Sequence, residues 1–390
     1  MRTKVAIIGS GPAGLLLGAL LHAAGIDNII IEQRSRDYVL SRIRAGVLEQ
    51  GTVDILRRLG VSARLDHEGL PHQGFSIGYA NRSLRIDLAD LTNGSKVMVY
   101  GQTEVTRDLM DARLQAGLTT LYEAENTTLH DFDSFKPSVS CQVAGKTITI
   151  DCDVIAGCDG FHGVSRASVP VNAINQFERV YPFGWLGIMA DVPPCSHELI
   201  YASHPRGFAL CSMRSTTRSR YYLQVKADEN IAEWPDHRFW DELRRRLDPV
   251  AADNVVPGPS IEKSVAPLRS FVAEPLQFGR LFLVGDAAHI VPPTGAKGLN
   301  LAASDAFYLS EALIEYYADR TPAALCRYSA RALDRIWKAE RFSWSMTTLL
   351  HRFDHYSAFE QKMQDAEFAF LESSRTARQA MAENYIGLPL

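Results

Sequence analysis

The chain has 390 residues, 46% of them hydrophobic and 22% charged, which is a globular composition with enough length for more than one domain. Its formal net charge of −4 offers no general basic surface, so nucleic acid is excluded as an expected partner. The six cysteines show no CxxC pair and no compact His/Cys spacing, so we expect no metal site, no disulfide framework and a cytoplasmic location.

The N-terminal segment could be read as an export signal or a membrane span, because two basic residues precede the apolar run Val5–Leu21. The run contains Gly9-Ser-Gly-Pro-Ala-Gly14, and a second apolar segment, Asn28–Ile31, ends at Glu32. Glycines at this spacing let a backbone approach a pyrophosphate at a helix N-terminus, and an acid about twenty residues later can bind a ribose. The pattern therefore predicts a buried parallel strand, a tight turn and a buried helix.

Two later segments look like further parts of one flavin site. Gly157-Cys-Asp-Gly160 lies in the middle of the chain. The segment Arg280–His289 begins as an apolar strand, and Asp286 stands where that strand ends. The glycine-rich turn Gly295–Asn300 then enters a helix expected through Leu299–Leu309. An acid at the end of a strand can bind a sugar hydroxyl, so the three motifs together predict FAD held by one large domain.

A coarse pass along the chain predicts an α/β unit at each end of a β-rich middle. We expect helices at Val47–Leu59 and Arg107–Ala116, strands at Thr147–Ile150 and Val154–Ala156, and helices from Ser304 onward. An apolar stripe in the C-terminal part indicates core packing or a subunit contact, and it comprises Leu325, Tyr328, Leu333, Ile336, Trp337 and Phe342. The predicted fold class is α/β: a Rossmann-like FAD-binding domain over 1–180, interrupted near 72–100 and completed by 269–320; an inserted antiparallel β-sheet substrate domain over 181–268; and a helical C-terminal interface region over 321–390.

The middle segment holds the sharpest physical clue. Strand alternation puts Phe208, Leu210, Ser212 and Arg214 on one face, so an arginine shares a face with bulky apolar side chains. If that face is buried the guanidinium needs an anion, although an internal ion pair or a strand end that faces water explains it equally well. The next strand sets Arg220, Tyr222 and Gln224 on one face, and a carboxylate ligand between the strands would satisfy both.

Further motifs give the chain a family resemblance. Together with the flavin motifs, Ile43–Gly51, Tyr100–Thr103, Tyr181–Gly187, His204–Phe208 and Glu383–Pro389 run in order along the whole chain. The sequence resembles the 4-hydroxybenzoate 3-monooxygenases, which are single-component FAD-dependent aromatic hydroxylases. The resemblance implies an oxidoreductase that reduces FAD with NADPH, forms a flavin C4a-hydroperoxide with O2, and converts 4-hydroxybenzoate to 3,4-dihydroxybenzoate (protocatechuate) in aromatic hydrocarbon catabolism. It also implies a homodimer with a small aromatic acid as substrate and no membrane partner.

The same resemblance assigns catalytic and substrate-binding residues. The tyrosine at Tyr201 would bind the substrate hydroxyl, and Tyr385 would continue a proton relay towards His72. As lone residues both tyrosines would be read as packing side chains. Arg214 would pair with the substrate carboxylate; the other substrate-binding residues would be Ser212, Tyr222, Arg220 beside the reactive flavin position, and Pro293 and Thr294 along the ring.

The cofactor residues follow partly from the motifs and partly from the resemblance. For FAD these are Gly9, Gly11, Gly14, Glu32, Arg44, Gln102, Asp159, Asp286, Lys297, Gly298, Leu299 and Asn300. Ala13 stands where many relatives have serine, which removes one pyrophosphate hydrogen bond but keeps the backbone donors. The helix N-terminus after Gly298 would stabilise the anion formed on flavin reduction.

A nicotinamide cofactor would have to bind over the surface, because there is no second GxGxxG. The residues implied in nucleotide binding are Arg34, Arg42, Arg44, His162, Arg166 and Arg269. Free arginines favour the 2′-phosphate of NADPH, whereas a solvated basic face is the alternative for Arg34 and Arg36. The order Gln33-Arg34 reverses one associated with NADPH users, so NADH stays open.

Other functions remain compatible with the sequence. A hydroxylase of another hydroxy- or aminobenzoate would share every motif, as would a flavin reductase or oxidase that does not insert oxygen. A non-catalytic FAD or aromatic-acid sensor is a third class, and it would show no substrate-stimulated NAD(P)H consumption.

Overall fold

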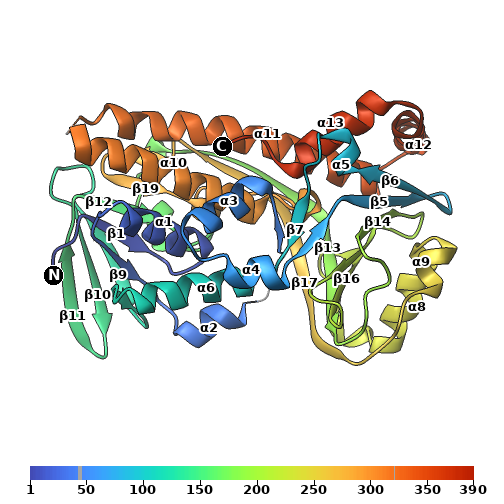
Figure 1. The fold of residues 1–390 in the computed structure, drawn as a ribbon, viewed down its shortest axis with the longest axis horizontal. Coiled ribbons are helices and arrows are strands. Elements are labelled where there is room, and N and C mark those ends of the chain that lie inside the picture. The colour runs from blue at the N-terminus through green and yellow to red at the C-terminus, as the bar shows by residue number, and fades with distance from the viewer. Residues whose placement is uncertain (43–45, 320) are drawn as a thin grey trace.

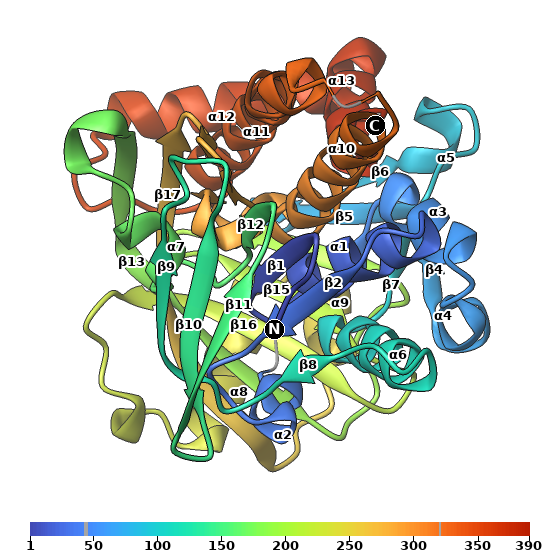
Figure 2. The same ribbon diagram turned by 90° about the vertical axis from the view of Figure 1, so that its left-hand side faces the viewer.

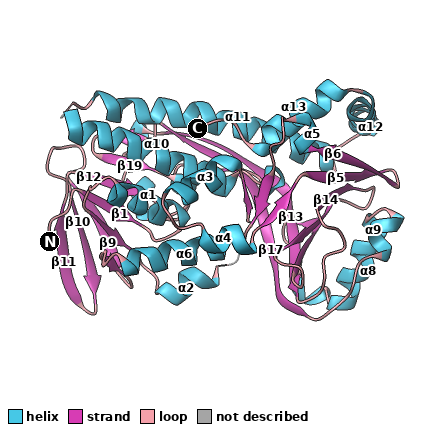
Figure 3. Ribbon diagram, in the orientation of Figure 1, coloured by secondary structure: helices cyan, strands magenta, loops and turns pink. Residues whose placement is uncertain are grey.

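The structure is a computed structural model that describes residues 1–42, 46–319 and 321–390. A mixed α/β part occupies the N-terminal side in Figure 1, and a larger sheet with two peripheral helices occupies the opposite side. The long C-terminal helices run across both parts. Figure 3 shows the same contrast between the helix-rich side and the strand-rich side.

The first sheet is the predicted Rossmann-like core. Its order is β18–β19–β12–β1–β2–β8, parallel except for β18, and its strands are β1 (Val5–Ile8), β2 (Asn28–Ile31), β8 (Thr120–Leu121), β12 (Val154–Gly157), β18 (Gln277–Phe278) and β19 (Leu281–Leu283). The strands β1, β2 and β12 are buried at every position, as a parallel sheet covered on both faces requires. The apolar N-terminal run is therefore β1 and helix α1 (Pro12–Ala23), as predicted from its glycines.

Helices and a small sheet surround this core. They are α2 (Arg36–Ser41), α3 (Gln50–Arg58), α4 (Ala63–Glu68), α6 (Gln102–Gln115) and α7 (Val164–Ala167), with the antiparallel sheet β11–β10–β9 made of β9 (Glu125–His130), β10 (Ser138–Val143) and β11 (Lys146–Asp151). Figure 2 shows that small sheet standing in front of the parallel sheet, with the C-terminal helices above both. Two sequence expectations need correction. Residues Val47–Leu48 form a strand rather than the start of a helix, and α6 begins at Gln102, five residues before the predicted Arg107.

The large sheet has the order β20–β17–β13–β16–β15–β14–β5–β6. Its strands are β5 (Gly74–Tyr79), β6 (Arg82–Asp87), β13 (Asn175–Ala190), β14 (Leu199–Ser203), β15 (Ala209–Met213), β16 (Ser219–Lys226), β17 (Ser260–Glu274) and β20 (His289–Ile290). All neighbours are antiparallel except β14 and β5. The strands predicted between residues 183 and 225 are thus present, and strands from residues 74–87 and 260–290 extend the same sheet.

Both faces of the large sheet are buried. One face packs against α8 (Asp236–Arg246) and α9 (Pro249–Asp253), two helices that the sequence analysis did not predict. The other face turns towards α11 (Ala323–Leu350), α12 (Ala358–Ser373) and α13 (Arg375–Ile386). Helix α5 (Leu88–Leu91) also lies beside the large sheet, against α13 and β5. The second small sheet, β3–β7–β4, lies beside this face and consists of β3 (Val47–Leu48), β4 (Leu70–His72) and β7 (Val97–Val99).

Helix α10 (Gly298–Asp319) connects the flavin motifs to the C-terminal helices. It begins at Gly298, directly after the 3-10 turn Pro293–Gly295, and packs against α1 and α11. Short 3-10 turns also occur at Val171–Ala173, Ile231–Glu233 and Gly285–Ala287. Ala324, Leu325, Tyr328 and Ile336 of α11 are buried, whereas Trp337 is 41% exposed, so the predicted apolar stripe is core along most of its length and surface at Trp337.

Candidate functional site

The glycine turn between β1 and α1 fits a pyrophosphate. Gly9 has φ +102°, and a Cβ there would lie 2.5 Å from the carbonyl oxygen of Cys158. A Cβ on Gly14 would collide with the carbonyl oxygen of Gly9, whereas a Cβ on Gly11 would meet nothing within 4 Å. The N-terminus of α1 has no side-chain cap and no acid in its first turn. Its backbone N–H donors therefore remain for an anion beside open space, which is what the pyrophosphate of FAD needs.

Glu32 closes the same turn from the end of β2. Its carboxylate accepts hydrogen bonds from the backbone N–H of Ser10 at 2.7 Å and of Arg34 at 2.7 Å, and from the Ser10 hydroxyl. The acid is buried and braces the turn, and its contact with the adenosine ribose stays a prediction. Gln102 lies at the N-terminus of α6, and Arg44 lies outside the described residues.

The middle motif presents a partly satisfied carboxylate. One oxygen of Asp159 accepts hydrogen bonds from the backbone N–H and the hydroxyl of Ser165 at 2.8 and 2.9 Å. Its other oxygen, Oδ1, is buried and has no hydrogen-bond partner among the described residues. Burial raises the pKa of Asp159, as expected when an ionised carboxylate is held away from water. This oxygen is thus an acceptor available to a ligand hydroxyl.

Asp286 lies on a braced turn after β19. The 3-10 turn Gly285–Ala287 carries it, and the backbone N–H of Gly285 donates to Asp305 of α10 at 3.0 Å. The same Asp305 oxygen is 2.6 Å from Nε2 of the buried His289. This pair fixes the turn that presents Asp286 where β19 ends, which is the position predicted for a ribityl contact.

The residues predicted at the start of α10 belong to a buried ion-pair network. Lys297 Nζ lies 2.7 Å from a Glu49 oxygen and donates to the carbonyl of Tyr385 at 2.9 Å, while Arg335 binds the other Glu49 oxygen at 2.8 Å. Burial lowers the pKa of Lys297. Asn300 accepts from the backbone N–H of Glu49 at 2.9 Å and donates to two backbone carbonyls. Their described partners are protein groups, and direct contacts of Lys297, Gly298, Leu299 and Asn300 with FAD stay predictions.

Sequence reasoning did not find Glu49 and Arg335 as members of this network. Glu49 lies inside the quoted motif Ile43–Gly51, and Arg335 interrupts the apolar stripe of α11 at a buried position. A charged residue at a buried helix position is the signal that could have indicated a partner. The identity of that partner depends on long-range packing.

One face of the large sheet brings the predicted substrate residues together. Tyr201 on β14, Ser212 on β15 and Tyr222 on β16 lie on the face that turns towards α11 and α13. The hydroxyl oxygens of Tyr201 and Tyr385 are 2.8 Å apart, and both side chains are buried. Burial raises the pKa of Tyr201 to about 12, so its hydroxyl stays protonated at neutral pH and can donate.

Two guanidinium groups lie beside this face. Arg220 is 4% exposed, forms an ion pair with Glu262 at 2.6 Å, and lies 5.1 Å from the ring centre of Tyr222. Arg214 follows β15 directly, donates to the carbonyl of Met213 at 3.0 Å, and burial lowers its pKa. The hydroxyl of Ser212 donates to the carbonyl of Arg220 at 2.9 Å. Among the described residues, the cations Arg214 and Arg220 and the carboxylate of Glu262 leave a net positive charge here, which suits a ligand carboxylate or phenolate.

His72 on β4 is buried and neutral. Burial lowers its pKa to about 4, and neither ring nitrogen has a hydrogen-bond partner among the described residues. The structure therefore supplies the direct Tyr201–Tyr385 contact of the predicted relay. The last step, to His72, stays a prediction.

The ring-lining loop packs on α11. Pro293 and Thr294 form the 3-10 turn before α10, and Thr294 is completely buried. Its hydroxyl oxygen is hydrogen-bonded to that of Thr347 on α11 at 2.9 Å. This bond holds the turn in place relative to the C-terminal helices.

The predicted nucleotide residues lie in two groups. Arg166 lies about equally far from the rings of Phe161 and Phe271, at 4.5 and 4.6 Å, and Arg269 lies 4.6 Å from Phe161 and pairs with Glu178 at 3.0 Å. His162 next to them is exposed. The second group is Arg34 and Arg42, which are exposed and flank the ring of Tyr38, while Arg36 pairs with Asp111.

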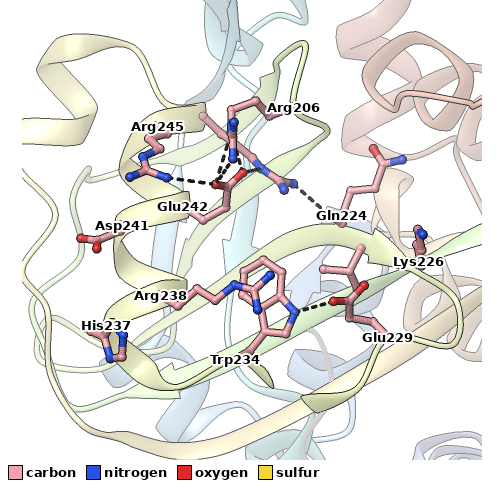
Figure 4. Close-up of a pocket in the computed structure, with 12 residues that line it drawn as sticks. Arg206, Gln224, Lys226, Glu229, Trp234, His237, Arg238, Asp241, Glu242 and Arg245 are labelled. Carbon is pink, nitrogen blue, oxygen red and sulfur yellow. Dashed lines mark hydrogen bonds and ion pairs between the residues drawn. The ribbon is translucent and has the colours of Figure 1, made fainter. Parts of the chain in front are cut away.

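An open surface cavity of about 750 Å³ lies elsewhere, beside α8 and β16. Figure 4 shows Arg206 and Arg245 directed at Glu242, and Trp234 directed at Glu229. None of the residues that line it is a predicted catalytic or cofactor-binding residue. It therefore does not contribute to the site described above.

Comparison with known proteins agrees with this geometry. The profile of the FAD binding domain family matches residues 2–343. The chain is 59% identical over 389 residues to a p-hydroxybenzoate hydroxylase of Acinetobacter baylyi, covering 100% of this chain and 96% of that relative. The chain belongs to the FAD-binding-domain family. It is a flavoprotein monooxygenase that uses FAD, NAD(P)H and O2.

More distant relatives of this flavoprotein monooxygenase share its fold. A 3-(3-hydroxy-phenyl)propionate/3-hydroxycinnamic acid hydroxylase of Mycolicibacterium smegmatis is 27% identical over 321 residues, which are 78% of this chain and 53% of that relative. The crystal structure of a p-nitrophenol 4-monooxygenase from Pseudomonas putida superposes with a TM-score of 0.84 at 18% identity, with both chains fully covered. These likenesses confirm the predicted fold class.

Two further expectations concern metals and membranes. Within residues 1–42, 46–319 and 321–390, no cluster of His, Cys, Asp and Glu side chains could hold a metal ion. No helix in the same ranges has both the length and the apolar character needed to cross a bilayer.

Proposed function

We propose that this flavoprotein monooxygenase hydroxylates 4-hydroxybenzoate at the 3-position to give 3,4-dihydroxybenzoate. The observation that supports this substrate best is the pair of buried tyrosine hydroxyls, Tyr201 and Tyr385, 2.8 Å apart beside the sheet face that leads to Arg214. 4-Hydroxybenzoate carries a phenol at one end of its ring, which would match the tyrosine pair, and a carboxylate at the other end, which would match Arg214. The name of the 59% identical relative points to the same substrate.

Arg214, with Ser212 and Tyr222, would bind the carboxylate and thereby fix the direction of the ring. A guanidinium offers two parallel N–H donors to a carboxylate, so it sets orientation as well as charge. Arg220 is held by Glu262 and Tyr222, which keeps its charge beside the site where the flavin ring would lie. Pro293 and Thr294 would close the opposite side of the ring.

Tyr201 would accept the proton of the substrate phenol as it passes its own hydroxyl proton to Tyr385, and the substrate ring becomes electron-rich. Its hydroxyl is hydrogen-bonded to Tyr385, so a proton can move between the two phenols without opening the site. His72 would pass the proton on towards solvent, because an imidazole with a pKa of about 4 is neutral and does not retain a proton at neutral pH. FAD, when bound, supplies the reducing equivalents and the activated oxygen.

Gly9, Gly11, Gly14 and the N-terminus of α1 would hold the FAD pyrophosphate. Glu32, Gln102, Asp159 and Asp286 would bind its ribose and ribityl hydroxyls, and the start of α10 would face the flavin ring. Gly285, braced by Asp305, fixes the turn that carries Asp286. NAD(P)H would bind over Arg166, Arg269, His162 and the basic segment after Glu32, and NADPH is the proposed form because several of these arginines are exposed.

The test is a coupled assay with isotopically labelled dioxygen. Purified FAD-loaded enzyme, 4-hydroxybenzoate and NADPH should give labelled 3,4-dihydroxybenzoate in proportion to the NADPH consumed. NADPH consumption with only hydrogen peroxide as product would instead support a reductase or oxidase. A panel of other hydroxy- and aminobenzoates, run with NADPH and NADH, decides the substrate and the coenzyme.

The assembly and location are also proposals. Exposed aromatic side chains on α11, Trp337 and Trp344, together with Phe177 of β13, support a subunit contact in a homodimer. Light scattering on the purified protein tests the proposed homodimer.

All six cysteines are free thiols, which supports a cytoplasmic location. We also propose three parts: an FAD-binding domain over 1–180 and 269–320, a substrate domain over 181–268, and a C-terminal interface region over 321–390. Strands β5 and β6 support the interruption of the first part near 72–100, because they pair within the large sheet.

A further inference from the structure

The buried ring of His351 joins the end of α11 to strand β13. The indole Nε1 of Trp185 donates to His351 Nε2 at 2.7 Å, and His351 Nδ1 lies 3.0 Å from the carbonyl oxygen of Thr347. An indole N–H can only donate, so Nε2 must accept and the hydrogen of the neutral imidazole is on Nδ1, where it donates to Thr347. Both ring nitrogens are therefore satisfied, and His351 is completely buried.

A protonated imidazole would not fit this arrangement. A hydrogen on Nε2 would face the N–H of Trp185, and burial lowers the pKa of His351 to about 3. The residue therefore holds a single tautomer at neutral pH. Its role is positional rather than acid–base.

The rings around His351 reach the proposed substrate site. The imidazole stacks on Phe183 at 4.7 Å and on Phe208 at 4.3 Å, and Phe208 stacks on Trp185 at 5.0 Å. Trp185 in turn lies 5.1 Å from the ring of Tyr222. Fixing the Trp185 ring therefore fixes the wall behind Tyr222.

The other end of the connection is the ring-lining loop. Thr347 is one helical turn before His351, and its hydroxyl is bonded to Thr294 at 2.9 Å. A continuous series of contacts thus runs from Thr294 through Thr347, His351 and Trp185 to Tyr222. Its two ends are the proposed contacts on opposite sides of the substrate ring.

We propose that His351 is a positioning residue whose two hydrogen bonds set the separation between the Tyr222 side and the Thr294 side of the substrate pocket. It thereby determines the width of the aromatic ring that the enzyme accepts. The inference rests on the proposed function, because Tyr222 and Thr294 are proposed substrate contacts. His351 itself is not among the proposed substrate or flavin contacts.

The experiment compares three variants of the FAD-loaded enzyme. His351→Phe keeps a ring but removes the acceptor, His351→Gln keeps an acceptor and a donor, and His355→Gln is the control, because His355 is an exposed histidine in the same segment. Dissociation constants for 4-hydroxybenzoate and 3-chloro-4-hydroxybenzoate are measured by titration of the flavin absorbance. The indole N–H signals of ¹⁵N-tryptophan-labelled protein are recorded in parallel, and Trp185→Phe identifies the signal of Trp185.

The proposed positioning role of His351 predicts a specific combination of results. In His351→Phe the Trp185 indole signal moves, the affinity for 4-hydroxybenzoate falls about tenfold, and the preference over the chlorinated analogue shrinks by a similar factor, as expected when a buried N–H loses its acceptor. His351→Gln recovers most of the affinity and the preference, and His355→Gln behaves as the native enzyme.

Three results would overturn the inference alone, provided that the native enzyme binds 4-hydroxybenzoate. They are an unchanged affinity ratio in His351→Phe, an equal loss in His351→Gln, and an equal loss in His355→Gln. A native enzyme that does not bind 4-hydroxybenzoate would overturn the proposed substrate, and the inference with it.

Discussion

Tyr201 on strand β14 and Tyr385 on helix α13 are 184 positions apart in the chain, and their hydroxyl oxygens lie 2.8 Å apart. The ring of Phe75 contacts both, edge-on to Tyr201 at 5.5 Å and stacked on Tyr385 at 4.2 Å. The pair is thus held by packing as well as by its hydrogen bond. This geometry makes the two tyrosines act as one unit.

We expect Tyr201→Phe to bind substrate and to consume NADPH but to hydroxylate poorly. Removing the hydroxyl takes away the group that would stabilise the substrate phenolate, so product per NADPH should fall at least about tenfold, since one positioned proton-transfer group contributes roughly 100- to 10,000-fold in rate. Product and peroxide are measured by chromatography against NADPH consumed. Tyr356→Phe, outside the site, is the control, and a product yield equal to the native one would remove Tyr201 from its proposed role.

Arg214→Gln should weaken binding of the aromatic acid much more than binding of FAD. Loss of a charge-assisted bidentate contact costs about 2–3 kcal/mol, or roughly 30- to 150-fold in the dissociation constant. Equilibrium titrations of 4-hydroxybenzoate and of FAD to apoprotein measure both. Arg218→Gln is the control, because Arg218 lies in the turn between β15 and β16 and forms an exposed ion pair with Asp191. An unchanged substrate titration in Arg214→Gln would contradict the assignment.

Two glycines of the first turn should respond differently to alanine. In Gly14→Ala the new Cβ would meet the backbone of Gly9, so we expect a misfolded or unstable apoprotein. In Gly11→Ala the Cβ enters open space, so the apoprotein should unfold at a native-like urea concentration while FAD binds at least about tenfold more weakly, because the backbone can no longer approach the pyrophosphate. Native FAD affinity in Gly11→Ala would show that the cofactor does not lie there.

The local parts of this fold were predictable from the sequence, and the reason is physical. The strand, turn and helix at residues 5–23 are specified by a buried apolar run and by glycines that are close in the chain. The apolar spacing of Val47–Leu48 continues into α3 and therefore predicts helix, whereas pairing with β7 makes this segment a strand. Helix α8 lies in a segment that the sequence predicts as part of the β-sheet domain, because only tertiary packing places its apolar face against the sheet.

The site could be predicted only in part for a similar reason. Alternation along β15 and β16 placed Ser212 and Tyr222 on one face, as the structure has them. Tyr201 and Tyr385 are 184 positions apart in the chain, so their contact is implied by the family resemblance and not by any local pattern. The link between Glu49 and Arg335 spans 286 positions and was not predicted at all.

Arg335→Met should destabilise the fold strongly. The guanidinium binds buried Glu49 and the carbonyls of Leu388 and Pro389, so its loss leaves a buried carboxylate with one cation fewer and frees the C-terminal segment after Tyr385. Removing one partner of a buried ion pair costs about 3–5 kcal/mol, measured here as the free energy of unfolding in urea. Lys338→Met is the control on the same helix, and it should cost less than about 0.5 kcal/mol because its pair with Asp334 is exposed. Equal effects of the two substitutions would contradict the buried network.

His72→Gln should change how stability depends on pH. Burial lowers the pKa of His72 from 6.5 to about 4, so the unfolded chain takes up a proton near pH 6.5 whereas the folded chain does so only near 4. This contribution is complete above the unfolded pKa and is lost as the pH falls through the folded pKa. The difference between the folded and the unfolded pKa of His72 corresponds to roughly 3 kcal/mol in the free energy of unfolding.

The native protein should therefore lose free energy of unfolding relative to His72→Gln as the pH falls from about 7 to about 4.5, because glutamine has no proton to take up there. Urea unfolding of both proteins across that range gives the difference directly. His67→Gln serves as a control, since the His67 side chain on helix α4 is exposed and its variant should follow the native curve. Parallel curves for the native protein and His72→Gln would show that His72 titrates normally in the folded state, and a normally titrating imidazole would not be the buried neutral acceptor that the proposed relay requires.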